Sequence, residues 1–301
     1  MKNGDRIMPA SPSALKAWIL ASRPKTLVAS MSPVLIAASL TPSIRLDLLC
    51  LCLAFSICIQ IGANFANDYF DCLKGADTSD RVGPSRAAQS GWIALPRLKR
   101  GMYLVFVLAA LISLPLLARG GAWGFWIVGL SILFAVWYTA GSRPLGYLGL
   151  GELLVFVFYG PIATLSTYYV LTLKWDWLVF FASLPPGLLS CSILIANNLR
   201  DEATDRLANK RTLVVRWGRT FGRLEYAVTV ILAFTLPILL ATLQKAPTTW
   251  VSMSLLFPLT YPALKRALYA ETPQEFVPLL PASAKLLALY TAGALFQTFL
   301  I

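Results

Sequence analysis

The apolar stretch LDLLCLCLAFSICIQIG, residues 46–62, runs directly into the polar stretch ANFANDYFDCLKGADTSDR, residues 63–81. The first part is close to the length of helix, about 20 residues, that crosses the hydrocarbon core of a bilayer. The second part contains two asparagines and four aspartates. Because a carboxylate near lipid costs free energy and ionisable residues there are usually functional, this junction predicts a membrane helix that ends in a functional site.

The composition agrees with a membrane protein. The chain has 301 residues, of which 57% are apolar and 13% charged, whereas soluble domains have roughly 25% charged residues. We therefore expect an all-α polytopic membrane protein that forms a single domain over residues 1–301, with about nine transmembrane helices. The predicted spans lie near 24–42, 46–66, 100–118, 122–140, 152–172, 177–197, 223–243, 248–264 and 282–300.

The net charge of +12 follows the membrane topology and does not indicate nucleic-acid binding. When the loops between the nine spans are assigned alternately to the two sides, 22 of the 26 Lys and Arg residues fall on one side. Since basic residues concentrate in cytoplasmic loops, this places the N-terminus in the cytoplasm and the C-terminus outside. Residues 1–22 lack the pattern of a cleaved signal peptide.

Several kinds of chemistry are excluded by residue type. The chain has no histidine, which removes His-activated nucleophiles and most zinc chemistry. The five cysteines lie mostly within the predicted spans and are interpreted as small packing residues, not as a disulfide framework.

A second acidic stretch, ANNLRDEATDRLANKRTLVVRWG, follows the sixth predicted span at residues 196–218. It resembles the first, since GANFAND ends one apolar helix and IANNLRD ends the other, which hints at an internal duplication. In a helix the polar residues of each stretch fall near one face. They are Asn64, Asn67, Asp68 and Asp71 in the first stretch and Asn197, Asn198, Asp201 and Asp205 in the second.

Two matched clusters of amide and carboxylate oxygens on one side of the membrane indicate a site for a hard divalent cation. Mg²⁺ takes one or two carboxylates and fills its other positions with water and substrate phosphate oxygens. The neighbouring Lys and Arg side chains suit a diphosphate. The alternative is that these acids only solvate helix ends and pair with nearby Arg, but the chain is otherwise poor in acid.

At these residues the sequence resembles the UbiA superfamily of intramembrane prenyltransferases, over nearly the whole chain. Asn67, Asp68 and Asp71 match the family motif N-D-x-x-D-x-x-x-D, whose last position falls on Gly75 here, while the next acid, Asp77, comes two residues late. The second motif, D-x-x-x-D, is met by Asp201 and Asp205. The resemblance implies nine helices around a central cavity open to lipid.

The branch of the family that acts on 1,4-dihydroxy-2-naphthoate is the most similar. It shares NDYFDCLKGADTSDRVGPSR, residues 67–86, GELLVFVFYGP, residues 151–161, and ASRPKTL, residues 21–27. The family usually has Gly where Asn209 stands, a departure that bears on the shape of that loop. The alternatives are phytyl transfer to the same acceptor, or 4-hydroxybenzoate or homogentisate as acceptor. Outside the family, an ion-coupled transporter could use the same acids.

The resemblance also implies roles for individual residues. Asp68 and Asp71 would serve one Mg²⁺ and Asp201 and Asp205 another, with Asp77 in place of the missing ligand. The substrates would be a polyprenyl diphosphate, which enters from the membrane lipid, and an aromatic acid acceptor. The residues expected to bind substrate are Asn67, Asn198 (or Asn197), Lys74, Arg81, Arg200, Lys210, Arg211, Arg23 and Lys25.

Three charged residues have alternative interpretations. Arg23 and Lys25 either grip a substrate or only set the topology at a helix entrance. Glu152, at the start of the fifth span, either orients the aromatic substrate or pairs with Arg143.

Overall fold

The computed structural model describes residues 12–76, 82–243, 245 and 247–297. All the elements of regular secondary structure among the described residues are helices, with no strand, which confirms the predicted all-α fold. The N-terminal half contains α1 (Ala14–Ala21), η1 (Pro24–Thr26), α2 (Leu27–Ser39), α3 (Leu46–Leu73), α4 (Leu95–Trp137), η2 (Leu145–Leu148), α5 (Gly151–Val157), η3 (Phe158–Ile162) and α6 (Ala163–Thr172). The C-terminal half contains α7 (Trp177–Leu207), α8 (Leu213–Thr242), η4 (Thr248–Trp250), α9 (Val251–Ser254), η5 (Phe257–Thr260), α10 (Tyr261–Tyr269), α11 (Pro273–Phe276) and α12 (Leu279–Gln297).

All nine predicted ranges fall in helical structure, but the helices differ in length. Among the described residues, 6 helical segments are long and apolar enough to cross a membrane. One of them, α4, contains two predicted spans, because Gly121 breaks it with φ 60° and ψ −146°. The first predicted range contains α2, which has only 13 residues, and the range near 248–264 is broken into η4, α9, η5 and part of α10. The total of nine spans stays a prediction.

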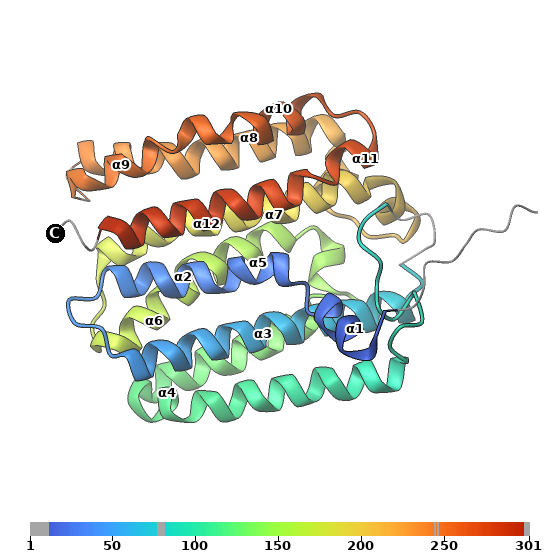
Figure 1. Ribbon diagram of the computed structural model, residues 1–301, viewed down its shortest axis with the longest axis horizontal. Helices are drawn as coiled ribbons and strands as arrows, with labels where there is room; N and C mark the ends of the chain where they lie inside the picture. The colour runs from blue at the N-terminus through green and yellow to red at the C-terminus, as the bar shows by residue number, and fades with distance from the viewer. Residues whose placement is uncertain (1–11, 77–81, 244, 246, 298–301) are drawn as a thin grey trace, which may run out of the picture.

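The long helices lie side by side along the longest axis of the molecule (Figure 1). α3 packs against α4, α7 packs against α8 and α12, and α2 lies between α3, α6 and α12. The C-terminal ends of α3 and α7 lie at the same end of the bundle, near α1 and α11 (Figure 1). The fold therefore brings the two acidic stretches to one end.

Side chains on the outside of the bundle are apolar, as expected for helices that face lipid. Trp126, Leu133 and Trp177 expose 63%, 51% and 76% of their surface. The largest buried cluster lies between α7, α8 and α12 and includes Tyr226, Phe234 and Phe276. The five cysteines are all free; Cys52 and Cys191 are buried, as expected for packing residues, whereas Cys50 is exposed.

A break in the fifth span shapes the interior. The segment Phe158–Ile162, FYGPI, forms a π-helical turn in which Gly160 has non-helical dihedral angles. A Cβ atom on Gly160 would lie 2.9 Å from the carbonyl oxygen of Ser183 and 3.1 Å from the Cα of Gly187 on α7. Glycine is therefore required on both sides of this contact, and the close approach holds the turn against α7.

Candidate active site

The first acidic motif is buried at the end of α3. Asp68 is 2% exposed and Asp71 4% exposed. The Asp68 carboxylate accepts hydrogen bonds from the backbone N–H groups of Ala87, at 3.0 Å, and Ala88, at 3.4 Å. One oxygen of Asp71 accepts a hydrogen bond from the Tyr147 hydroxyl at 2.9 Å. The helix runs on through this motif to Leu73, which confirms that these residues share a helix.

Asn67 and Lys74 are linked through Thr139, which follows α4. The Thr139 hydroxyl donates to the Asn67 side-chain oxygen at 3.0 Å, and the Lys74 ammonium donates to the Thr139 carbonyl oxygen. Partial burial lowers the pKa of Lys74, and the negative charge of Asp71 opposes that shift.

The second acidic motif carries its own cations. The Arg200 guanidinium donates two hydrogen bonds to the Asp201 carboxylate, both at 2.7 Å, and the two side chains are 2% and 9% exposed. The Lys210 ammonium lies 3.6 Å from the Asp205 carboxylate. Asn209 has a φ of 54°, a left-handed conformation that glycine and asparagine adopt most readily. The departure from the family at Asn209 therefore preserves the shape of the turn.

The two adjacent asparagines of this motif point to different places. Asn198 is buried and donates to the Glu152 carboxylate at 2.7 Å, while Asn197 lines the central cavity. The alternative pairing of Glu152 with Arg143 is wrong, because Arg143 is exposed and makes no ion pair with the described residues. Of the two asparagines considered for the substrate site, the structure brings Asn197 into the cavity.

Tyr147, in η2, connects the two motifs. Its hydroxyl bonds to Asp71, and the ammonium groups of Lys74 and Lys210 lie 4.8 Å and 5.7 Å from its ring centroid. The backbone N–H of Arg211 donates to its carbonyl oxygen at 3.0 Å. Sequence reasoning did not select Tyr147 as a site residue. The available signal was its position in a predicted cytoplasmic loop, on the same side as both acidic stretches.

The segment 82–88 also contacts both motifs. Ala87 and Ala88 donate to Asp68 of the first motif, as described above. A Cβ atom on Gly83 would lie 2.7 Å from a guanidinium nitrogen of Arg200 in the second motif. The segment therefore covers the buried Arg200–Asp201 pair and holds Asp68 at the same time.

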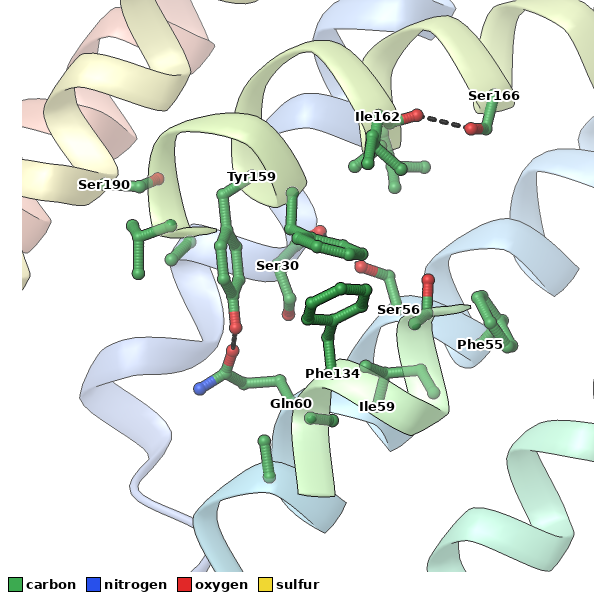
Figure 2. A pocket seen from close by; sticks show the side chains of 18 of the residues that line it. Ser30, Phe55, Ser56, Ile59, Gln60, Phe134, Tyr159, Ile162, Ser166 and Ser190 are labelled. Atoms are coloured by element: carbon green, nitrogen blue, oxygen red, sulfur yellow. Dashed lines mark hydrogen bonds between the residues drawn. The ribbon is translucent and has the colours of Figure 1, made fainter. Parts of the chain in front are cut away.

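A cavity of about 260 Å³ opens next to these motifs and runs between α2, α3, α4, α5, α6 and α7. Arg23, Asn67 and Asn197 line it near the acidic motifs, and Leu116 and Val170 line it far from them. Its walls are mainly apolar. Figure 2 shows part of this lining, including Phe134 and Ile59.

A hydrogen-bonded pair of polar side chains interrupts the apolar lining. The hydroxyl of Tyr159, from the π-helical turn, donates to the side-chain oxygen of Gln60 on α3 (Figure 2). The Gln60 amide nitrogen donates to Asn64 at 3.3 Å, and the Asn64 amide donates to the carbonyl oxygen of Ser22 at 2.8 Å. Sequence reasoning passed over Gln60, although an amide in the middle of an apolar span was the available signal.

The remaining predicted residues divide into three groups. Arg23 lines the cavity and has a φ of 52°, which is unusual for a residue other than glycine. Lys25 and Arg211 are exposed and do not line the cavity. Asp77 and Arg81 lie outside the described residues.

The donor set fits Mg²⁺ bound together with a phosphate-bearing substrate. No three Asp, Glu, Cys or His side chains of the described residues converge closely enough to hold a metal ion alone. The buried carboxylates supply only hard oxygen ligands, in pairs. This agrees with the way Mg²⁺ binds, through one or two carboxylates completed by substrate phosphates and water.

The chain belongs to the UbiA prenyltransferase family, whose model matches residues 26–276. It is therefore a membrane-embedded prenyltransferase of multi-span architecture, which confirms the predicted family. It is 41% identical to a 1,4-dihydroxy-2-naphthoate octaprenyltransferase of Mycobacterium tuberculosis, over 73% of this chain and 77% of the relative. It is 35% identical to the protein of that name from Haemophilus influenzae, over 88% and 90% of the two chains.

The fold also matches a solved structure. A UbiA homolog from Archaeoglobus fulgidus, described as bound to GPP and Mg²⁺, superposes with a TM-score of 0.63 at 13% identity. The match covers 93% of this chain and 99% of the homolog. At this identity the likeness establishes the fold alone.

Proposed function

We propose that this protein transfers a polyprenyl group from a polyprenyl diphosphate to 1,4-dihydroxy-2-naphthoate, releasing diphosphate and CO₂. The observation that carries the proposal is the identity of 35–41% to enzymes named for this acceptor, over most of both chains. The site agrees with it, because two acidic motifs stand at one end of an apolar cavity that suits an isoprenoid chain.

Asp68, Asp71, Asp201 and Asp205 are the residues proposed to hold Mg²⁺, which would neutralise charge on the diphosphate. Lys74 and Lys210 are proposed to bind diphosphate oxygens, since both lie over Tyr147 between the two motifs. Arg200 reaches the diphosphate only if it leaves Asp201, to which its guanidinium is bonded here. Arg23, at the end of the cavity next to Asn67, is proposed to bind the carboxylate of the acceptor.

The reaction balances without a protein base. The bond between the allylic carbon and the diphosphate oxygen breaks, and its electron pair leaves with the diphosphate. The ring carbon that bears the carboxylate forms the new C–C bond. The bond to the carboxylate then breaks, its electron pair restores the aromatic ring, and CO₂ leaves. The protein has to bind, orient and exclude water, which agrees with the absence of histidine from the chain.

The mainly apolar walls of the cavity would keep water away from the cation that forms during this reaction. Phe134 and Phe158 line the cavity with ring centroids 5.2 Å apart. Aromatic faces attract cations most strongly where water is excluded. We further propose that the protein lies in the cytoplasmic membrane with the acidic end of the bundle facing the cytoplasm, because 22 of 26 basic residues sort to that side.

The test is to incubate purified protein with Mg²⁺, a polyprenyl diphosphate and, separately, dihydroxynaphthoate, 4-hydroxybenzoate and homogentisate, and to identify products by mass. We expect a decarboxylated, prenylated naphthalenediol, no product with EDTA, and recovery on adding excess Mg²⁺. Asp71→Asn should abolish turnover. The matched control is Asp176→Asn. Asp176 is exposed and lies at the N-terminal end of α7, opposite the acidic motif, where its carboxylate accepts a hydrogen bond of 2.8 Å from the backbone N–H of Leu178. Prenylation of another acceptor alone would refute the proposed substrate.

A further inference from the structure

The hydrogen-bonded pair formed by Gln60 and Tyr159 could make further hydrogen bonds to a ligand in the cavity. An amide nitrogen carries two hydrogens, and Gln60 uses one of them, on Asn64. The Tyr159 oxygen donates to Gln60 and makes no other hydrogen bond with the described residues. Gln60 is 8% exposed and lines the cavity, so a ligand in the cavity can supply the partner that its second N–H lacks. Polar groups in such a place usually have partners, which indicates that a ligand supplies them.

A second orphan group lines the same cavity. The Ser190 hydroxyl, on α7, is buried and has no hydrogen-bond partner among the described residues. Figure 2 shows Ser190 and Tyr159 among the residues that line the cavity. The cavity therefore has polar features that an isoprenoid chain cannot satisfy, since that chain has no hydrogen-bonding atoms.

The depth of the pair suits the acceptor ring. Gln60 precedes Asp68 by eight residues on α3, which places it about 12 Å further along the helix from the acidic motif. If Asp68 holds the diphosphate through Mg²⁺, the allylic carbon attached to it would lie between these two levels. The edge of an aromatic ring that points away from the allylic carbon can therefore reach Gln60.

The chemistry of the pair selects a hydroxyl group. Gln60 offers a donor and Tyr159 an acceptor, and neither is charged, so the pair matches a group that both accepts and donates. A carboxylate would instead favour Arg23, which is the one Lys, Arg, Asp or Glu among the described residues that line the cavity. In 1,4-dihydroxy-2-naphthoate the 1-hydroxyl bonds internally to the adjacent carboxylate, whereas the 4-hydroxyl has no internal partner.

We propose that the Gln60–Tyr159 pair binds the 4-hydroxyl of the aromatic acceptor and so selects dihydroxylated over monohydroxylated naphthoates. This inference rests on the proposed function. The local structure holds the pair in place, because the contact of Gly160 with α7 fixes the π-helical turn that carries Tyr159. Local π-helical turns inside helices occur frequently at functional sites.

The experiment compares two ligands that differ only in the 4-hydroxyl, 1,4-dihydroxy-2-naphthoate and 1-hydroxy-2-naphthoate. Their dissociation constants are measured by naphthoate fluorescence with Mg²⁺ and a non-ionisable thiolo analogue of the prenyl diphosphate, so that no turnover occurs. The unaltered protein should bind the dihydroxy compound about threefold to tenfold more tightly, the effect of a hydrogen bond.

The decisive variant is Gln60→Met with Tyr159→Phe, which removes both members of the pair together, along with the 3.3 Å hydrogen bond from Gln60 to Asn64. It should bind the two ligands equally, while its affinity for the prenyl diphosphate analogue stays unchanged. The control is Tyr226→Phe, which removes a buried hydroxyl that bonds to Ser283 at 2.8 Å outside the cavity lining, and which should keep the preference.

The outcomes separate this inference from the proposed function. If the unaltered protein does not prenylate dihydroxynaphthoate, the proposed function and the inference both fail. If it does, but the double variant keeps the preference for the dihydroxy ligand, the inference alone is overturned. A double variant that loses affinity for the prenyl diphosphate analogue while keeping the preference would place the pair against the isoprenoid chain, and would also overturn it.

Discussion

Removing the Asp201 carboxylate should destabilise the fold more than removing any other carboxylate of the two motifs. The Arg200 side chain is 2% exposed and donates two hydrogen bonds of 2.7 Å to Asp201, under the backbone of Gly83. Asp201→Ala leaves this guanidinium buried without its carboxylate. Breaking a buried ion pair from one side costs about 3–5 kcal/mol, a large fraction of the 5–15 kcal/mol typical of a folded protein.

The measurement is the free energy of unfolding by SDS titration in bicelles, followed by tryptophan fluorescence. Asp71→Ala is the comparison. Among the described residues Asp71 accepts one hydrogen bond, from the Tyr147 hydroxyl, so its loss should cost about 1–3 kcal/mol. The double variant Arg200→Met with Asp201→Leu removes both charges and should recover most of the stability. A free energy of unfolding for Asp201→Ala within about 1 kcal/mol of that of the unaltered protein, roughly the size of one ordinary hydrogen bond, would refute this role of the Arg200–Asp201 pair.

Three further predictions concern residues near the site. Tyr147→Phe removes the hydroxyl that donates to the buried Asp71 carboxylate. Turnover should fall about tenfold to a hundredfold, roughly the effect of one hydrogen bond to a charged group, and the free energy of unfolding should fall by about 1–3 kcal/mol. Asn197→Ala should lower turnover without loss of stability. Asn198→Ala should lower the free energy of unfolding by about 1–3 kcal/mol, because the buried Glu152 carboxyl loses its hydrogen-bond partner. Equal effects of the two variants on turnover and on stability would contradict these different roles of Asn197 and Asn198. Gly160→Ala should destabilise by about 1–3 kcal/mol, because its Cβ would lie 2.9 Å from the Ser183 carbonyl oxygen; Gly129→Ala, which meets nothing within 4 Å, is the control for SDS titration.

The parts of the fold that follow from local composition could be predicted, and those that depend on helix packing could not. The length of the apolar runs predicted the membrane helices α3 and α7. Helical spacing predicted that Asp68 and Asp71 share one helix, and that Asp201 and Asp205 share another. The same spacing predicted equivalent positions for Asn197 and Asn198. Adjacent helical residues are about 100° apart, so only the packing of α5 against α7 decides that Asn198 meets Glu152 while Asn197 meets the cavity.

The site also depends on residues that carry no motif. Tyr147 belongs to a short turn between spans, yet its hydroxyl, ring and carbonyl oxygen contact Asp71, the two lysines and Arg211. Gln60 is a single amide in an apolar helix, and its partner Tyr159 is 99 residues away. Neither contact follows from helical periodicity, because the turn η2 places Tyr147 and the broken π-helical segment places Tyr159.

The burial of the two motifs gives a physical reason for placing cations beside them. In the structure Asp201 is neutralised by Arg200 and Asp205 by Lys210, and the Asp68 carboxylate is held by two backbone N–H groups. Buried carboxylates need such partners when no metal is bound, since an unpaired buried charge is costly. In the proposed function the four carboxylates would hold Mg²⁺, and Arg200 and Lys210, which pair with Asp201 and Asp205 here, would then be free to bind the diphosphate. One set of basic side chains would then serve both states, and this role would account for the Lys and Arg residues that stand among the acids in the sequence of each motif.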